Sequence, residues 1–327
     1  MKQGLIFASS RAKAKELNLF TEERLYRMME SKTLTDAVRV LAEANYADGE
    51  NVNTENFYEI LEKEERSVTA FVRETAPKGV GIECFFCRND YHNLKVLLKA
   101  RYVGIEDYTG MLLPNGNYVF ADLKERYENN TLSITNKYMG EALAIINREF
   151  ESGNRSPRLI DVELDKAMYR EINDILKGKN TDIYIKKYFE NLIDTSNIGS
   201  MLRTINIGAG FAFFEQGFLT GGKLSLNSFK ECGTDTAKFG KFINGTDYKE
   251  LYEKVKEKDL SGFETAKDNY LLKIFAVNKS DMFSVAPIVG YYLGKLNEIK
   301  VLRVVLICIK NNVSLDEMKK RVRMLYA

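Results

Sequence analysis

Apolar residues recur at every third or fourth position along most of the chain, and this spacing is typical of amphipathic helices. The alternation of apolar and polar residues that marks a half-buried strand is nearly absent, apart from a possible short strand near YVF at 118–120. Thr54 and Ser314 stand at expected helix starts, with Glu317 completing a capping box after Ser314, and Pro77 ends one helix. The sequence therefore predicts an all-α protein. Clear helical stretches are ENFYEILEKEERSVTAFVRE (55–74), RLIDVELDKAMYREINDILK (158–177) and FETAKDNYLLKIFAVNK (263–279).

One helical motif recurs three times, each time around an asparagine. The copies read NDYHNLKVLLK, DTSNIGSMLR and GKLNEIKVLR, and their asparagines lie 104 and then 100 residues apart. In each copy a leucine and then a cation follow, the cation six positions after the asparagine. The asparagines are Asn93, Asn197 and Asn297, and the cations are Lys99, Arg203 and Arg303.

A second block follows each motif. NGNYVFADLKE (115–125) aligns with GGKLSLNSFKE (221–231) and, through its tail, with SLDEMKK (314–320). The cation of the motif precedes the lysine of this block by 25, 27 and 16 residues in the three copies, so the third copy has lost a loop or a helical turn. A repeat of about a hundred residues is longer than the unit of a solenoid, and each copy is itself a small domain. The sequence predicts three related helical modules, 1–125, 126–231 and a shortened 232–327.

An aspartate precedes the asparagine by three residues in the first two copies. An acid before an apolar run suits a helix N-terminus, so Asp90 and Asp194 are expected to accept hydrogen bonds from exposed N–H groups there. The third copy has Gly294 at this position. The apolar residues that follow, such as Leu97 and Met201, form a stripe at helical spacing that predicts a buried face.

The three cations lie beside this stripe and have two interpretations. In the first, Lys99, Arg203 and Arg303 lay their stems on the core and pair with a neighbouring module. In the second, they contact a binding partner, and they are the only candidate partner-binding residues that the sequence offers.

Composition and charge restrict the function. The 327 residues are 45% hydrophobic, enough for two or three domains with real cores. The 48 lysines and arginines almost balance the 46 aspartates and glutamates, which argues against nucleic acid as a partner. The apolar patch near the start is too short for a signal peptide, and Arg303 interrupts the most apolar stretch, VLRVVLICI, so neither export nor a membrane span is expected.

The few cysteines and the single histidine suggest no metal or redox site. Four cysteines in a long chain fit a reducing, intracellular location better than a disulfide framework. Cys84 and Cys87 form a C-x-x-C without two further zinc ligands at suitable spacing, and we expect them to be small core residues. His92 is expected in the first turn of a helix, facing water. No metal and no cofactor is predicted.

The segment GFLTGGKL (217–224) imitates a nucleotide-binding loop. It satisfies G-x-x-x-x-G-K, but Leu224 stands where the serine or threonine that binds magnesium is required, and no buried strand precedes it. Turn glycines explain it better. No hydrolytic motif or metal triad occurs elsewhere, so no catalytic residue is predicted, and a nucleotide-binding enzyme using 217–224 is the least favoured alternative.

Three stretches together resemble the C subunit of the A-type and V-type rotary ATPases, whose eukaryotic counterpart is called the d subunit. RAKAKELNLFTEERLYRMMESKTLTDAVRVLAEANY from Arg11 is similar to the opening helices of that family, although Phe20 stands where a leucine pair is usual. LIDTSNIGSMLR is similar to its middle module, and APIVGYYLGKLNEIKVLRVVL (286–306) to its C-terminal signature. The signature positions matched are Pro287, Tyr291, Glu298, Leu302 and Arg303.

The resemblance implies a fold and a role. Three similar helical domains would surround a pseudo-threefold axis and form a funnel. Such a protein is a non-catalytic connector of the central stalk: it sits on the membrane rotor ring, holds the central shaft and transmits torque for ATP-coupled proton or sodium transport. It would be cytoplasmic, peripheral at the inner face of the membrane. A generic helical scaffold that binds other proteins remains the main alternative.

Overall fold

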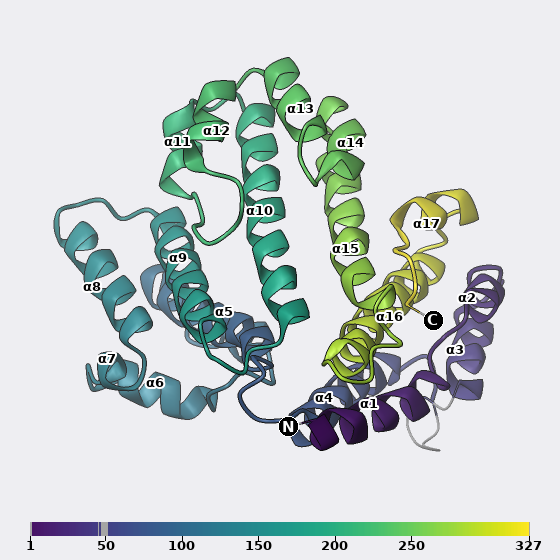
Figure 1. Cartoon of the computed structure of the whole chain (residues 1–327). Coiled ribbons are helices and arrows are strands. Elements are labelled where there is room, and N and C mark those ends of the chain that lie inside the picture. Colours follow the sequence, from purple (N-terminus) through teal and green to yellow (C-terminus); the bar gives the residue numbers. More distant parts are fainter. Residues whose placement is uncertain (1, 45, 47–51, 327) are drawn as a thin grey trace. The chain divides into compact units, whose positions relative to one another are not determined.

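A computed structural model of the chain describes residues 2–44, 46 and 52–326 (Figure 1). Residues 1 and 327, the outer limits of the first and third predicted modules, lie outside the described residues. All regular secondary structure in the described ranges is helical, which confirms the all-α prediction, and the segment near YVF forms no strand there. No helix within these ranges is both long enough and apolar enough to cross a membrane.

The described residues form two compact units. One unit combines the chain up to Val80 with the chain from Thr265 onward, and the other runs from Gly81 to Glu264. This division does not follow the sequence repeat, and the three modules 1–125, 126–231 and 232–327 stay a prediction. The helix α15 (Leu260–Ala276) begins in the second unit and ends in the first.

The first unit is built around α16 (Ala286–Lys310), which packs against helices from both ends of the chain. Its apolar run fills the core: Leu302, Val305 and Leu306 are fully buried, although Arg303 lies at the edge. Phe20 and Leu325 join the same core from distant parts of the chain. The helices around α16 are α1 (Lys2–Glu16), α2 (Glu22–Met29), α3 (Leu34–Glu43), α4 (Phe57–Thr75) and α17 (Leu315–Arg321).

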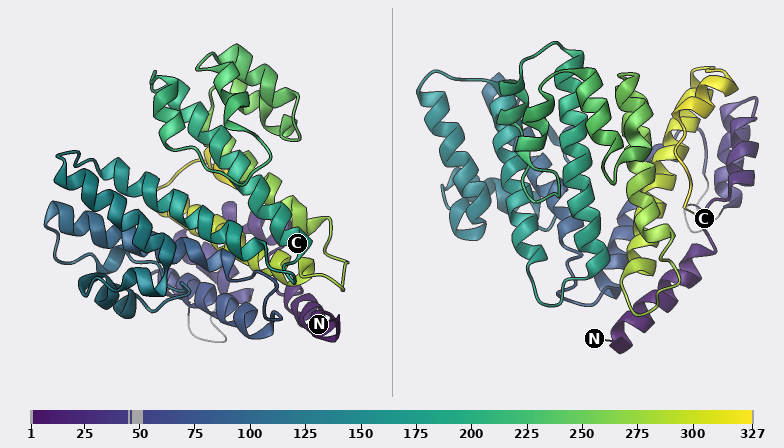
Figure 2. Two further views of the ribbon diagram at one scale, coloured as in Figure 1. Left: turned by 60° about the vertical axis from the view of Figure 1, so that its left-hand side comes forward. Right: turned by 45° about the horizontal axis from the view of Figure 1, so that its top comes forward.

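The second unit packs α9 (Pro157–Leu176) against α5 (Cys84–Val103) on one side and α8 (Lys137–Glu151) on the other (Figure 2). The long helix α10 (Ile183–Asn206) lies beside α9. Short helices complete this unit: η1 (Thr109–Met111), α6 (Phe120–Glu128), α7 (Leu132–Thr135), α11 (Phe211–Gln216), α12 (Leu226–Cys232), α13 (Thr236–Asn244), η2 (Lys249–Leu251) and α14 (Tyr252–Lys256).

Most of the predicted helices are present. The stretch 158–177 corresponds to α9, and 263–279 corresponds to α15, which ends at Ala276. Ser314 accepts a hydrogen bond from the N–H group of Glu317 at the start of α17. The prediction of a Thr54 cap was wrong, because α4 begins only at Phe57. The second repeat block begins a helix at corresponding residues in all three copies, namely α6, α12 and α17.

Candidate partner-binding cations and their surroundings

The three candidate cations lie at equivalent places on the three long helices α5, α10 and α16. Each is paired with a carboxylate of another helix. Lys99 is 2.6 Å from Asp161, Arg203 is 4.0 Å from Glu264, and Arg303 is 3.9 Å from Glu65. Their side chains remain 37%, 57% and 36% exposed, so each cation has both an internal partner and a face toward solvent.

The order of these pairs along the chain is cyclic. Lys99 of the first predicted module meets a carboxylate of the second, and Arg203 of the second meets one of the third. Arg303 of the third meets Glu65 of the first. This agrees with the first interpretation of the cations, in which each pairs with a neighbouring module. Contact with a binding partner stays a prediction.

Asp90 and Asp194 do not begin helices, contrary to the prediction. Both are buried well inside α5 and α10, which start at Cys84 and Ile183. An acid before an apolar run is therefore not a helix start in either copy.

Each of these carboxylates instead accepts hydrogen bonds from two successive N–H groups of the loop before the next short helix. Asp90 binds those of Asn117 and Tyr118 at 2.8 and 3.0 Å. Asp194 binds those of residues 223 and 224 at the same two distances. The two acids do accept hydrogen bonds from backbone N–H groups, but these groups belong to a loop distant in sequence and not to the start of a helix.

The repeated asparagines hold the same loops at a second point. Asn93 donates to the carbonyl oxygen of Leu113 and accepts from its N–H group, both at 2.8 Å. Asn197 does the same with Leu219, at 2.8 and 2.9 Å. An asparagine amide can satisfy both backbone groups of one residue, so each loop is fixed at a defined register on its long helix.

These anchors explain the segment GFLTGGKL. The loop needs glycine where it approaches α10, because Gly221 has a φ of 110° and a Cβ on Gly222 would overlap the carboxylate of Asp194. The N–H groups of Lys223 and Leu224, which a nucleotide-binding loop would offer to phosphate, bind that carboxylate. A negative charge therefore occupies the place where a phosphate would bind, and no strand precedes this loop within the described residues.

A buried charged cluster on α16 was not predicted from the sequence. Glu298 and Lys295 are almost fully buried and lie 2.8 Å apart, and Lys295 is also 3.2 Å from Glu64. Glu298 accepts hydrogen bonds from the N–H group of Phe20 at 2.7 Å and from the hydroxyl of Tyr46. Burial, and then the charge of Glu298, raises the pKa of Tyr46. Two opposite charges three residues apart within an apolar run are the signal that could have revealed this cluster.

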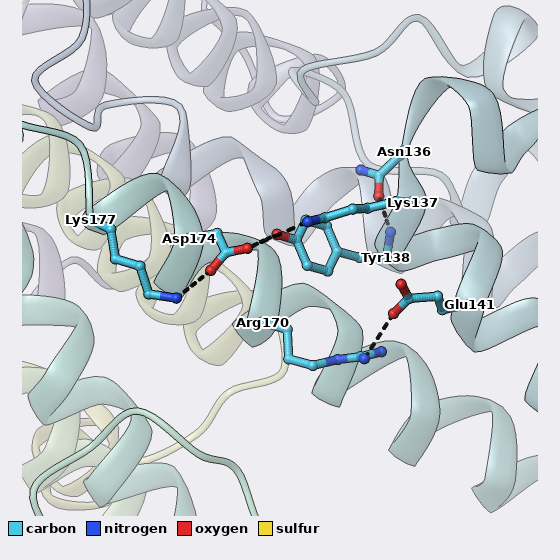
Figure 3. Close-up of polar contacts among 7 residues, drawn as sticks. All are labelled: Asn136, Lys137, Tyr138, Glu141, Arg170, Asp174 and Lys177. Carbon is cyan, nitrogen blue, oxygen red and sulfur yellow. Dashed lines mark hydrogen bonds and ion pairs between the residues drawn. The ribbon is translucent and has the colours of Figure 1, made fainter.

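A second polar group joins α8 to α9 on the surface (Figure 3). Asp174 lies between Lys177, at 2.6 Å, and the hydroxyl of Tyr138, while Arg170 is 2.9 Å from Glu141. Asn136 caps α8 by accepting hydrogen bonds from the N–H groups of residues 138 and 139, and its side chain is buried. These contacts tie the start of α8 to the end of α9.

The cysteines at the start of α5 and the single histidine are packed within the fold. Cys84 and Cys87 are buried at the start of α5, as predicted, and burial raises the pKa of both thiols. Such thiols are poor nucleophiles. His92 does not lie in a first turn facing water: it is half-buried in the middle of α5, with Nε2 3.0 Å from the carbonyl oxygen of Met111. No group of three or more metal-ligating side chains occurs in the described part of the chain.

Comparison with known proteins gives one consistent answer. A family model described as ATP synthase (C/AC39) subunit matches residues 8–321. The C subunit of the V-type sodium ATPase of Enterococcus hirae is 24% identical over 326 residues, covering 96% of each chain. The C subunit of the A-type ATP synthase of Methanocaldococcus jannaschii is 24% identical and covers 92% of this chain and 81% of its own. That of Thermococcus kodakarensis is 25% identical, covering 91% and 84%. The resemblance found in the sequence is thus confirmed, and the chain belongs to the ATP synthase (C/AC39) subunit family.

Proposed function

We propose that this protein is the non-catalytic connector of the central stalk in a V-type or A-type rotary ATPase. It joins the membrane rotor ring to the central shaft and transmits torque for transport of protons or sodium ions, which the whole complex performs. In this role it is peripheral at the cytoplasmic face of the membrane. The observation that carries the proposal is the family match over residues 8–321.

The contacts between repeats support a connector that resists deformation. Each long helix carries a cation that pairs with the next predicted module, and the pairs form a cyclic order. Two long loops are also fixed on their helices at two points each. We therefore propose that the three modules surround a pseudo-threefold axis, since a cyclic set of equivalent contacts is what such an axis produces.

Lys99, Arg203 and Arg303 are the candidate contacts with the ring or the shaft. Each keeps at least a third of its side chain exposed in spite of its internal carboxylate. A partner carboxylate could share such a cation, and charge pairs of this kind set the orientation and the association rate of a complex.

A co-sedimentation experiment tests the proposed role. The purified chain is mixed with detergent-solubilised rotor ring, with and without the central shaft. We expect the chain to sediment with the ring and the shaft to strengthen this binding. Absence of binding at both low and moderate salt would overturn the connector role and favour the generic helical scaffold.

A separate experiment tests the expectation that the chain does not bind nucleotide. The loop at 217–224 has committed two N–H groups to Asp194, so we expect no heat when the chain is titrated with millimolar ATP and magnesium in a calorimeter. Saturable heat that disappears in a Lys223→Ala variant would contradict this expectation and support a nucleotide site.

A further inference from the structure

The third copy of the repeat fixes a different segment of chain on its long helix. In the first two copies one asparagine binds both backbone groups of a loop residue, Leu113 or Leu219. In the third copy Asn297 donates to the carbonyl oxygen of Met324 at 2.7 Å, and Asn269 of α15 accepts from its N–H group at 3.1 Å. Met324 is thus held in the same way, but by two asparagines, and it follows the short helix α17 instead of preceding it.

A side chain near the C-terminus also occupies the place of the acid that the third copy lacks at Gly294. In the first two copies a carboxylate occupies the space against the loop glycine: a Cβ on Gly116 or Gly222 would overlap Asp90 or Asp194. In the third copy the glycine is on the long helix itself. A Cβ on Gly294 would lie 2.6 Å from both Cβ and Cγ of Tyr326, and a Cβ on Gly290 would overlap the hydroxyl of Tyr326. The Tyr326 ring therefore lies along α16 in a groove that exists because both residues are glycine.

The same segment reaches three helices. Arg323 forms an ion pair with Asp268 of α15 at 2.7 Å, and the Tyr326 hydroxyl lies 3.4 Å from Glu16 of α1. Leu325 is buried in the core around α16. All of these contacts lie within one compact unit.

We propose that residues 322–326, here called the strap, are an intramolecular latch that replaces the deleted loop of the third repeat and holds α15 and α1 against α16. The sequence explains why both the loop and the acid are absent from the third copy. The shortened spacing between Arg303 and Lys319 removes the loop, and Gly294 removes the acid that would have bound it. In the strap, the backbone of Met324 binds the long helix where a loop residue does so in the other copies. The ring of Tyr326 occupies the place that an aspartate has in those copies.

Hydrogen exchange of the full chain tests the latch. Tyr326→Ala removes the buried ring, so exchange in residues 265–276 and in α1 should accelerate by at least about tenfold. Exchange in α5 and α9 should not change. Lys320→Ala is the control, since Lys320 belongs to α17 and pairs locally with Glu317. Unchanged exchange in α15 and α1 of Tyr326→Ala would overturn the proposal.

A double-mutant cycle provides a second test that does not need a strongly destabilised chain. Gly290→Ala should lower the urea midpoint in the parent, because its methyl group would overlap the hydroxyl and ring of Tyr326, but should not lower it when Tyr326 is already Ala, since the ring atoms that it meets are then absent. Equal effects in both backgrounds would mean that the ring does not lie at Gly290, and the latch would be rejected. If Tyr326→Ala does not fold, Asn269→Ala replaces it in the exchange experiment, and the same acceleration in residues 265–276 is expected.

Discussion

Glu298 holds together parts of the first unit that are far apart in sequence. Its carboxylate joins Lys295 on its own helix to Tyr46 and to the backbone of Phe20. A buried charge is costly when its partner is removed, because the remaining charge has no water to solvate it.

Glu298→Gln should therefore lower the free energy of unfolding by about 3 kcal/mol, the loss typical of a broken buried pair. Urea unfolding monitored by circular dichroism measures this change. Glu317→Gln, which removes an exposed pair within α17, is the matched control and should leave the urea midpoint almost unchanged. Similar midpoints for the two variants would contradict the assigned role of Glu298.

Asp194 makes a similar prediction for the second unit. In Asp194→Asn one oxygen becomes an NH₂ group facing an N–H donor of the loop or the Tyr248 hydroxyl, so a buried donor loses its acceptor. We expect a loss of about 1 to 3 kcal/mol, with faster exchange of the amides of Lys223 and Leu224. Protection of these amides equal to that in the parent would show that the carboxylate is not their acceptor in solution.

Asp174 predicts a dependence of stability on pH. Hydrogen bonds from Lys177 and Tyr138 lower the pKa of this carboxyl from 3.8 to about 2. A lowered pKa in the folded state stabilises the protein above pH 3.8, and this contribution is lost as the pH falls toward 2. The group is exposed, so the contribution is small, about 0.5 kcal/mol.

The melting temperatures of the parent and of Asp174→Asn measure this effect between about pH 7 and about pH 2.5. The parent should melt higher at neutral pH, and the difference should shrink as the pH falls. Glu125→Gln, an exposed position in the middle of α6, serves as control. A difference that is constant across this range would refute the contribution of the ionised form.

At the scale of elements, α5 and α9 face each other through a row of polar pairs. Tyr91 donates to Glu171, Lys95 pairs with Asp165, and Lys99 pairs with Asp161. The residue numbers increase along α5 while those of the partners decrease along α9, so the two helices are antiparallel. The row fixes their relative translation, because a shift by one turn would bring each side chain opposite the wrong partner.

Exchanging the charges of one pair tests this register. Lys99→Asp alone places two acids together and should lower the free energy of unfolding by about 1 kcal/mol, whereas the double variant Lys99→Asp/Asp161→Lys should recover most of it. Urea midpoints of the four chains of the cycle give the coupling. Failure of the second substitution to recover stability would mean that the two side chains do not face each other.

The elements also show what could be predicted from sequence and what could not. Periodicity was sufficient for α9 and α15, and for the buried stripe that contains Leu97 and Met201. Local sequence did not predict the starts of α5 and α10. An acid before an apolar run looks the same in the sequence whether the acid caps its own helix or binds a remote loop. The donors for Asp90 lie at 117–118, a pairing that no local pattern reveals. The cluster around Glu298 did give a local signal in Lys295, but its remaining partners at residues 20, 46 and 64 lie far away in the sequence.

For the whole molecule, the question is whether the three cations serve the fold, a partner, or both. The triple variant Lys99→Ala/Arg203→Ala/Arg303→Ala removes all three half-exposed pairs, each contributing at most about 1 kcal/mol, so the chain should stay folded. Binding to the rotor ring or shaft should weaken, and co-sedimentation together with far-UV circular dichroism measures both properties. Weaker binding with unchanged helicity would assign the cations to a partner, and loss of helicity would assign them to the fold alone.

The cyclic order of the ion pairs has a consequence for how such a repeat can be assembled. In a linear array of repeats the first and last units each present one unsatisfied interface, so they need special polar caps. Here every predicted module both gives a cation and receives one, because the last module pairs with the first. By this pairing no module is terminal, so none requires a cap. A fourth copy inserted between two modules would separate a cation from its present carboxylate, so this set of pairs is complete only with three modules.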